Sequence, residues 1–151
     1  MYLNQALDTA VKIEAELAEC YRLMSLMDSR EIFFNTLKIL SQEEISHLNA
    51  LKAGKNYLYQ APEEFGEVRT ALEDLENGLS RIKEFHQALE TGSMDLKTAL
   101  QTMHSLEKSY EKVHLTTLMS IQNEELKRLF QALCNYDQEH RKRLERLLDQ
   151  V

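Results

Sequence analysis

Acidic side chains interrupt the apolar stripes of four helix-like segments in this chain. With spacings of three and four residues, each segment gathers aliphatic and aromatic residues on one face, which is typical of an amphipathic helix. Near the middle of each face an acid takes the place of an apolar residue: Glu14, Glu44, Glu107 and Asp137. No Lys or Arg falls on any of these stripes. Because a carboxylate facing a core is costly unless an opposite charge meets it, the pattern predicts a cationic partner inside the fold.

Two histidines follow two of these acids at a distance of three residues, as Glu44-x-x-His47 and Asp137-x-x-His140. Residues so spaced are neighbours on one helix face, separated by about 4.5 Å of rise. A carboxylate can bridge two ions through its two oxygens, whereas a neutral imidazole supplies one nitrogen. The simplest partner for four acids and two imidazoles is therefore a pair of metal ions, and mixed oxygen and nitrogen ligands favour iron or manganese.

An internal repeat relates residues 1–54 to residues 94–147 by an offset of 93 positions. Three polar pairs share this offset: Glu14 with Glu107, Glu44 with Asp137, and His47 with His140. A third acid-x-x-His, Glu111 to His114, maps onto Ala18 and Tyr21, so we place it outside the primary ligand set. Five histidines in a chain with about one acid in six residues should produce about one such motif by chance. The repeated set is therefore a stronger signal than any single motif.

The chain of 151 residues has one Pro and four Gly, which is too little turn chemistry for a sheet protein and favours long helices in a single domain, 1–151. We expect helix pairs over about 4–53 and 94–149, with Gly54 at the end of the second helix. The stretch 54–93 is longer than a tight link requires and predicts a crossover that returns the chain along the bundle. Its helix-prone part, 67–89, should be divided at Gly78.

Composition limits the classes of partner and the compartment. A net charge of -7 argues against nucleic acid, and no apolar run is long enough for a membrane span. Cys20 and Cys134 are isolated thiols, and no signal-peptide core opens the chain, so we expect a cytoplasmic protein in a reducing compartment.

The sequence resembles the rubrerythrin-type members of the ferritin-like di-iron carboxylate superfamily. Four segments carry the resemblance, one for each bundle helix: AVKIEAELAECYR, LSQEEISHLNAL, ALQTMHSLEKSYEKVH and ALCNYDQEHRKRL. The resemblance implies an all-α, ferritin-like four-helix bundle that holds two iron ions, with manganese or mixed metals as alternatives. It also implies the metal ligands Glu14, Glu44, His47, Glu107, Asp137 and His140.

Tyr21 and His114 are candidate catalytic residues. Tyr21 lies seven residues after Glu14 and matches a tyrosine found near the site in such proteins. His114 stands at the corresponding place after Glu107, two turns away on the same face, as a supporting group or an alternative ligand. The chain departs from the family in three ways: Asp137 replaces a glutamate, Tyr110 replaces a further glutamate, and no Cys-x-x-Cys marks a rubredoxin-like domain.

The expected function is a di-iron redox protein that reduces hydrogen peroxide or dioxygen, with electrons from a separate donor protein. A ferroxidase that oxidises and releases iron is the alternative within the same fold. A metal-free helical module that binds a partner protein, or a zinc hydrolase, would be a different class, although four carboxylates oversupply negative charge for one zinc. We also expect a homodimer.

Overall fold

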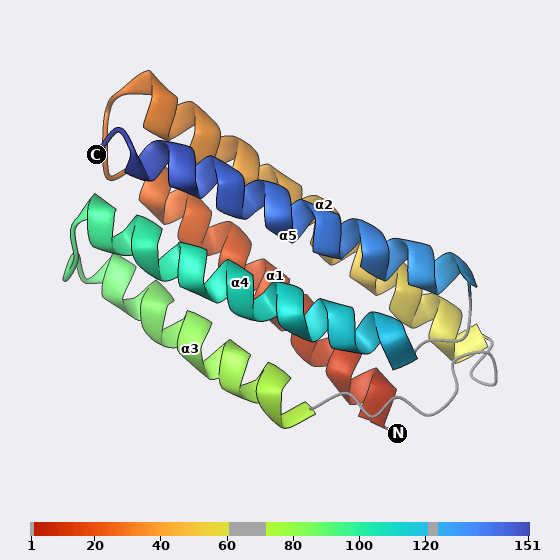
Figure 1. Ribbon diagram of the computed structural model, residues 1–151. Helices are drawn as coiled ribbons and strands as arrows, with labels where there is room; N and C mark the ends of the chain where they lie inside the picture. Colours follow the sequence, from red (N-terminus) through yellow and green to blue (C-terminus); the bar gives the residue numbers. More distant parts are fainter. Residues whose placement is uncertain (1, 61–71, 121–123) are drawn as a thin grey trace.

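The computed structural model describes residues 2–60, 72–120 and 124–151, and within them all the regular secondary structure is α-helical. The helices are α1 (Tyr2–Ser25), α2 (Glu31–Gln60), α3 (Leu72–Glu90), α4 (Leu96–Ser120) and α5 (Glu124–Leu148). Figure 1 shows them as five long rods that run side by side. The all-α expectation is confirmed. No described helix is both long and apolar enough to cross a bilayer.

The helices pack mainly as neighbours in sequence. α1 lies along α2 and α3, and α4 lies along α5, whereas α3 with α4 and α2 with α5 make smaller contacts. In Figure 1, consecutive helices run in opposite directions, so α3 carries the chain back along the bundle before α4 begins. The two helix pairs and the returning segment therefore take the order that the sequence predicts, and the returning segment is itself a packed fifth helix. Residues 61–71 of the expected crossover lie outside the described residues.

Two glycine-based predictions are wrong. α2 does not end at Gly54 but continues to Gln60, with Gly54 buried inside the helix. α3 is not divided at Gly78, which lies where this helix approaches α4: the Tyr110 hydroxyl donates a hydrogen bond of 2.9 Å to the Gly78 carbonyl. A Cβ at this position would meet Tyr110 Cε1 at 2.9 Å, so the glycine serves close packing rather than a break.

The turn between α3 and α4 has a glycine at the end of α3 and an aspartate N-cap at the start of α4. Gly92 has a φ of 67°, and the Ser93 amide donates to the Ala88 carbonyl at 3.1 Å, as at a helix end closed by a left-handed glycine. Asp95 then caps α4, because its Oδ1 accepts the Thr98 amide at 2.8 Å. These two residues fix where the chain reverses and hence the height of Glu107 in the bundle.

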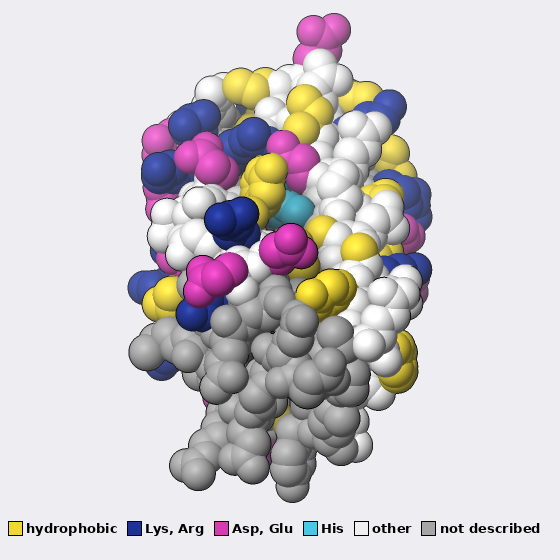
Figure 2. All heavy atoms as spheres, turned by 90° about the vertical axis from the view of Figure 1, so that its right-hand side faces the viewer, with side chains coloured by type: hydrophobic (Ala, Val, Ile, Leu, Met, Phe, Trp, Pro, Cys, Tyr) yellow, Lys and Arg dark blue, Asp and Glu magenta, His cyan; other side chains and the backbone are white. Residues whose placement is uncertain are grey.

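Two apolar clusters form the core. The larger includes Leu17, Leu40 and Leu144, and the smaller includes Leu7 and Leu133. Along α1, α2 and α5, an acidic residue (Glu14, Glu44 and Asp137) lies between members of the two clusters. These acids therefore form a polar layer with an apolar cluster on either side. Burial of each leucine side chain contributes roughly 1.5–3 kcal/mol to the free energy of folding. The clusters thereby offset the cost of burying the acidic side chains between them. On the face in Figure 2, acidic and basic side chains are interspersed with hydrophobic ones.

Candidate metal centre

Eight polar or ionisable side chains meet inside the bundle, two from each of α1, α2, α4 and α5. They are Glu14 and Tyr21, Glu44 and His47, Glu107 and His114, and Asp137 and His140. None is more than 5% exposed. All six predicted ligands and both candidate catalytic residues are thus buried in the core, as helices with the acids on their apolar faces require.

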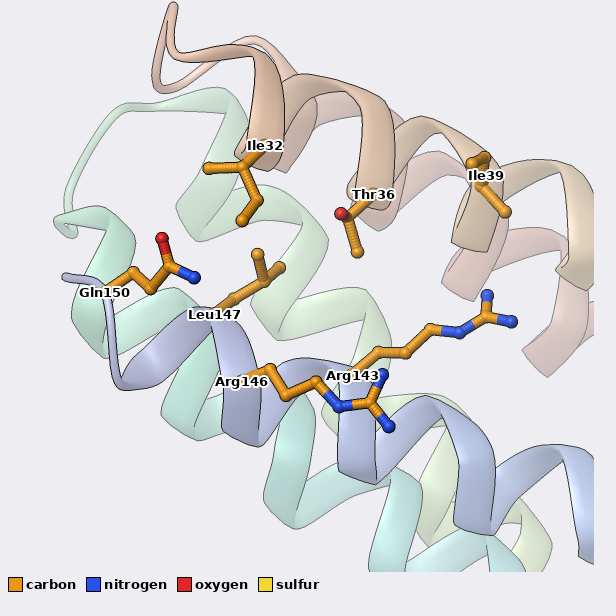
Figure 3. A pocket seen from close by; sticks show the side chains of 7 residues that line it. All are labelled: Ile32, Thr36, Ile39, Arg143, Arg146, Leu147 and Gln150. Atoms are coloured by element: carbon orange, nitrogen blue, oxygen red, sulfur yellow. The ribbon is translucent and has the colours of Figure 1, made fainter.

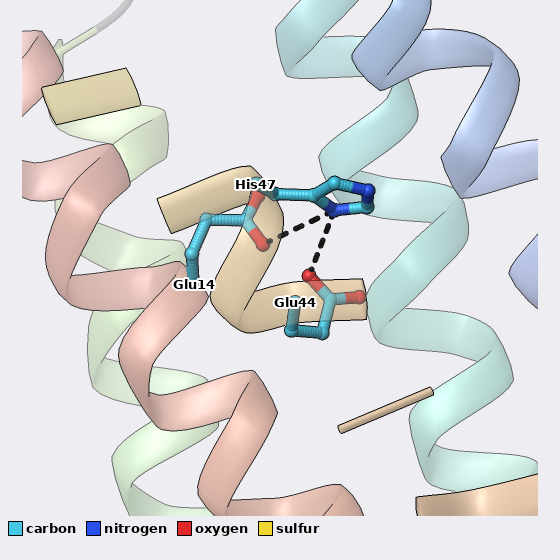
Figure 4. A group of neighbouring side chains, drawn as sticks. All are labelled: Glu14, Glu44 and His47. Atoms are coloured by element: carbon cyan, nitrogen blue, oxygen red, sulfur yellow. Dashed lines mark hydrogen bonds and ion pairs between the residues drawn. The ribbon is translucent and has the colours of Figure 1, made fainter. Parts of the chain in front are cut away.

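The first group joins α1 to α2. His47 Nδ1 lies 3.2 Å from Glu44 Oε2 and 3.8 Å from Glu14 Oε2. Figure 4 shows both carboxylates turned toward this one ring nitrogen. Glu14 Oε2 is buried without a hydrogen-bond partner. Glu14, Glu44 and His47 therefore present ligand atoms to a common point.

The second group joins α2, α4 and α5. His140 Nδ1 lies 2.7 Å from Glu44 Oε1 and 3.4 Å from Glu107 Oε1. Glu44 belongs to both groups: its Oε2 faces His47 and its Oε1 faces His140. The rings of His47 and His140 stack with centroids 5.4 Å apart and planes inclined by 20°. The two groups are adjacent, and one carboxylate spans them.

The donor sets fit metal ions. Within each group the ligand atoms lie within 4.8 Å of one another, and ligands held at about 2.0–2.2 Å from one ion lie about 3 Å apart. Two carboxylate oxygens, Glu14 Oε2 and Glu107 Oε2, are buried with no hydrogen bond. Such orphaned oxygens are costly in a protein interior, and a cation would satisfy them. Two buried Glu/His triads could therefore hold metal ions.

The electrostatics of the metal-free centre show a shortage of positive charge. Burial, and then the charge of Glu44, raise the pKa of Glu14 well above its usual range. Burial and the charge of Glu107 raise the pKa of Glu44 to about 7. Burial opposes ionisation of Glu107 too, but hydrogen bonds from His140 and Tyr21 outweigh it and lower the Glu107 pKa. Among the described residues, the ion-pair partners of these three acids are all histidines.

Tyr21 and Tyr110 have separate roles. The Tyr21 hydroxyl donates a hydrogen bond of 2.7 Å to Glu107 Oε1, so this tyrosine touches a predicted ligand directly. Tyr110, one turn beyond Glu107, instead reaches out to α3 and the Gly78 carbonyl. Tyr110 therefore makes a packing contact with α3 and takes no part in either triad.

His140 is supported from outside by Glu43, a residue that the sequence analysis missed. His140 Nε2 lies 2.8 Å from Glu43 Oε2, and Arg143 donates to Glu43 Oε1 at 2.9 Å. The bond to His140, with that from Arg143, outweighs partial burial and lowers the pKa of Glu43 to about 2. A carboxylate on the second ring nitrogen is the usual support of a metal-binding histidine. The repeat hides this role, because Glu43 maps onto Tyr136.

Asp137 is buried at the same level but joins neither triad. Its Oδ2 lies 2.6 Å from His114 Nδ1, and His114 Nε2 lies 3.8 Å from Glu14 Oε1. Glu111 points elsewhere, since it pairs with Arg141 and accepts a hydrogen bond from Gln138. Only the histidine of the third acid-x-x-His therefore reaches the centre.

Two grooves lie between α2 and α5, the helices that make only a small contact. One, of about 320 Å³, is bordered by His47, Ala50, Ala132 and Tyr136, and the Tyr136 ring centroid lies 4.8 Å from that of His47. The other, of about 360 Å³, lies nearer the chain end between Ile32, Thr36, Ile39, Arg143, Arg146, Leu147 and Gln150 (Figure 3). The first groove leads from the surface to a side chain of the centre.

Comparison with protein families, with curated proteins and with solved structures found no significant match to this chain. The sequence and geometry described above therefore carry the functional assignment.

Proposed function

We propose that this protein is a ferritin-like di-iron protein that reduces hydrogen peroxide or dioxygen. The observation that carries the proposal is the sharing of Glu44 between two buried triads, each with its own histidine. Glu44 directs one oxygen toward each of two stacked imidazoles. This arrangement favours one dinuclear centre over two independent metal sites. The order of two helix pairs with a return between them supports the same fold.

Five side chains would hold the ions: Glu14, Glu44 and His47 in one triad, with Glu107 and His140 completing the other. Two adjacent iron ions, with manganese as the alternative, would supply the two electrons that reduction of peroxide requires. The protein's part is to hold the ligands rigidly in a dry interior. Glu43 orients the His140 ring, and the Tyr21 hydroxyl donates a hydrogen bond to Glu107 Oε1.

The groove beside His47 supports a small substrate. It has a volume of about 320 Å³, and the Tyr136 ring lies beside the His47 ring at its edge. Peroxide and dioxygen are small enough to enter this groove and reach the side of His47. Cys20 and Cys134 are free and buried, so we propose that electrons come from a separate donor protein.

The same groove favours a second candidate, oxidation of ferrous iron as the substrate. It ends at a triad whose Glu14 oxygen has no hydrogen-bond partner, so an ion could enter and leave on this side. In that case the iron is cargo and departs after oxidation. A peroxidase would retain its iron over many turnovers.

Anaerobic titration with Fe(II), followed by peroxide or dioxygen, tests the proposal. We expect saturation at two irons per chain and a change in near-ultraviolet absorbance when oxidant is added. Iron that stays bound over repeated turnover with a reductant supports the peroxidase, and released ferric iron supports the ferroxidase. The variant His47→Ala should bind one iron per chain instead of two. Its matched control is His104→Ala, since His104 lies outside the centre against Glu145. Absence of saturable uptake would overturn both candidates.

A further inference from the structure

The two halves of the centre are not equivalent, although the repeat predicts that they should be. Glu44 serves both triads, but its repeat mate Asp137 serves neither. The aspartate is one methylene shorter, and its Oδ2 is engaged 2.6 Å from His114 Nδ1. The position that the repeat reserves for a second bridging carboxylate is therefore occupied by a carboxylate bound to a histidine.

His114 breaks the repeat in the same place. Its mate is Tyr21, a phenol that donates to Glu107. In the second half an imidazole replaces the phenol; it lies just outside both triads, and its Nε2 faces Glu14 Oε1, the oxygen turned away from His47, at 3.8 Å. Once this imidazole gives up its Nε2 proton, with its Nδ1 proton hydrogen-bonded to a carboxylate, Nε2 carries a lone pair, which is the form that binds metals.

The ring of His114 is held in this orientation from more than one side. It is 5% exposed, Asp137 bonds one nitrogen, and Phe130 meets the ring edge-on at a centroid distance of 6.4 Å. The chain thus builds a carboxylate–histidine pair that aims a nitrogen at Glu14. The Glu43–His140 pair has the same construction on the opposite side of the centre.

We propose that His114 is a further nitrogen ligand, through Nε2, of the ion held by Glu14, Glu44 and His47, and that Asp137 is its positioning residue. The inference rests on the proposed dinuclear centre. One ion then has two imidazole ligands, His47 and His114, and the other has only His140. The two ions differ in affinity, and the ion with two imidazoles binds first and binds nitrogen-preferring divalent metals more tightly.

Cobalt(II) is a suitable probe, because its visible absorbance reports the ligands and does not depend on turnover. The wild-type protein should bind two Co(II) in two resolved steps. His114→Gln should weaken the tighter step and alter its spectrum, while the weaker step stays unchanged. Asp137→Asn should weaken the same tighter step by about 10–100-fold, the usual effect of losing the support of a metal-binding histidine. The matched control His104→Gln should change neither step.

Nuclear magnetic resonance gives a second measurement that needs no variant to fold. With ¹⁵N-labelled histidine and ¹¹³Cd(II), we expect one-bond cadmium–nitrogen coupling at Nε2 of His114 and at Nδ1 of His47 and His140. Two bound ions with no coupling to His114, or a loss shared equally by both Co(II) steps in Asp137→Asn, would overturn the inference and leave the dinuclear centre standing. A wild-type protein that binds no Co(II) or Cd(II) would overturn the proposed function itself.

Discussion

The hydroxyl of Tyr21 on α1 donates a hydrogen bond of 2.7 Å to Glu107 Oε1 on α4, with both side chains at 0% exposure. The bond lies in the polar layer between the apolar clusters, and the other oxygen of Glu107 has no hydrogen-bond partner. Without metal, Tyr21 is therefore one of the few groups that stabilise the ionised Glu107. His140, at 3.4 Å from the same oxygen, is another.

Removal of this hydroxyl should destabilise the metal-free protein. In Tyr21→Phe the ring still fills its space, but Glu107 loses a bond to a buried charge. We expect the free energy of unfolding to fall by about 1–3 kcal/mol, measured by urea denaturation with a chelator present. Tyr59→Phe is the control, because Tyr59 is 63% exposed on α2. Equal stability of the two variants would show that the bond contributes nothing.

Gly78 should resist substitution by alanine even though it is inside a helix. A new Cβ would stand 2.9 Å from Tyr110 Cε1, an atom of a buried ring that cannot move freely. Alanine gains about 1 kcal/mol in helix propensity, and overpacking costs about 1–3 kcal/mol, so Gly78→Ala should lower the stability or leave it unchanged. Calorimetry would measure this. The double variant with Tyr110→Leu should be relieved of the clash; a stabilising effect of Gly78→Ala alone would contradict the packing argument.

The repeat of acids on apolar faces predicted the helices, their order and the depth of the polar layer, because helical periodicity alone fixes which side chains face inward. The same argument predicted the convergence of six ligands, and the two triads bring together five of them, all but Asp137: Glu14, Glu44, His47, Glu107 and His140. It could not predict the end of α2, since a glycine stops a helix only when the chain must turn there. Gly54 is buried within packed helix instead.

The sequence pattern could not predict which side chains contact each other between helices. Glu43 is adjacent to Glu44 and sits on the side of α2 that faces α5, so only the packing reveals its bond to His140. Asp137 matched Glu44 in the alignment of the halves, but the loss of one methylene lets His114 engage it. An internal repeat predicts which positions are equivalent in the two halves. It does not predict which partner a shorter side chain at such a position will contact.

His86 should make the stability of the α1–α3 pair depend on pH. Burial lowers the pKa of His86, but the hydrogen bond to Glu16 and the charges of Glu16 and Glu90 outweigh it and raise the pKa above 6.5. Because the folded pKa is raised, the stabilisation is fully present below pH 6.5 and is lost as pH rises through the folded pKa. The stability difference between wild type and His86→Gln, from urea unfolding, should therefore shrink with rising pH. A difference that grows would contradict the ion pairs.

The groove beside His47 should control access to the centre. Ala132 is half-buried and lines this groove, so Ala132→Phe would fill it without removing any candidate ligand. We expect Co(II) uptake to be slowed several-fold in stopped-flow absorbance, with the number of bound ions unchanged. Ala53→Phe, at an exposed position on α2 outside the groove, is the control. Unchanged uptake in Ala132→Phe would mean that ions enter elsewhere.

Substitution of Glu44, the shared carboxylate, tests the proposed dinuclear centre most directly. Glu44 belongs to both triads, whereas Glu14 belongs to one. The measurement is metal bound per chain at equilibrium, by dialysis against Fe(II) without oxygen and elemental analysis, for wild type, Glu14→Ala and Glu44→Ala. We predict two ions, one ion and none, respectively, with circular dichroism confirming helical folds. Two ions retained in Glu44→Ala, or none bound by the wild type, would contradict a centre bridged by Glu44.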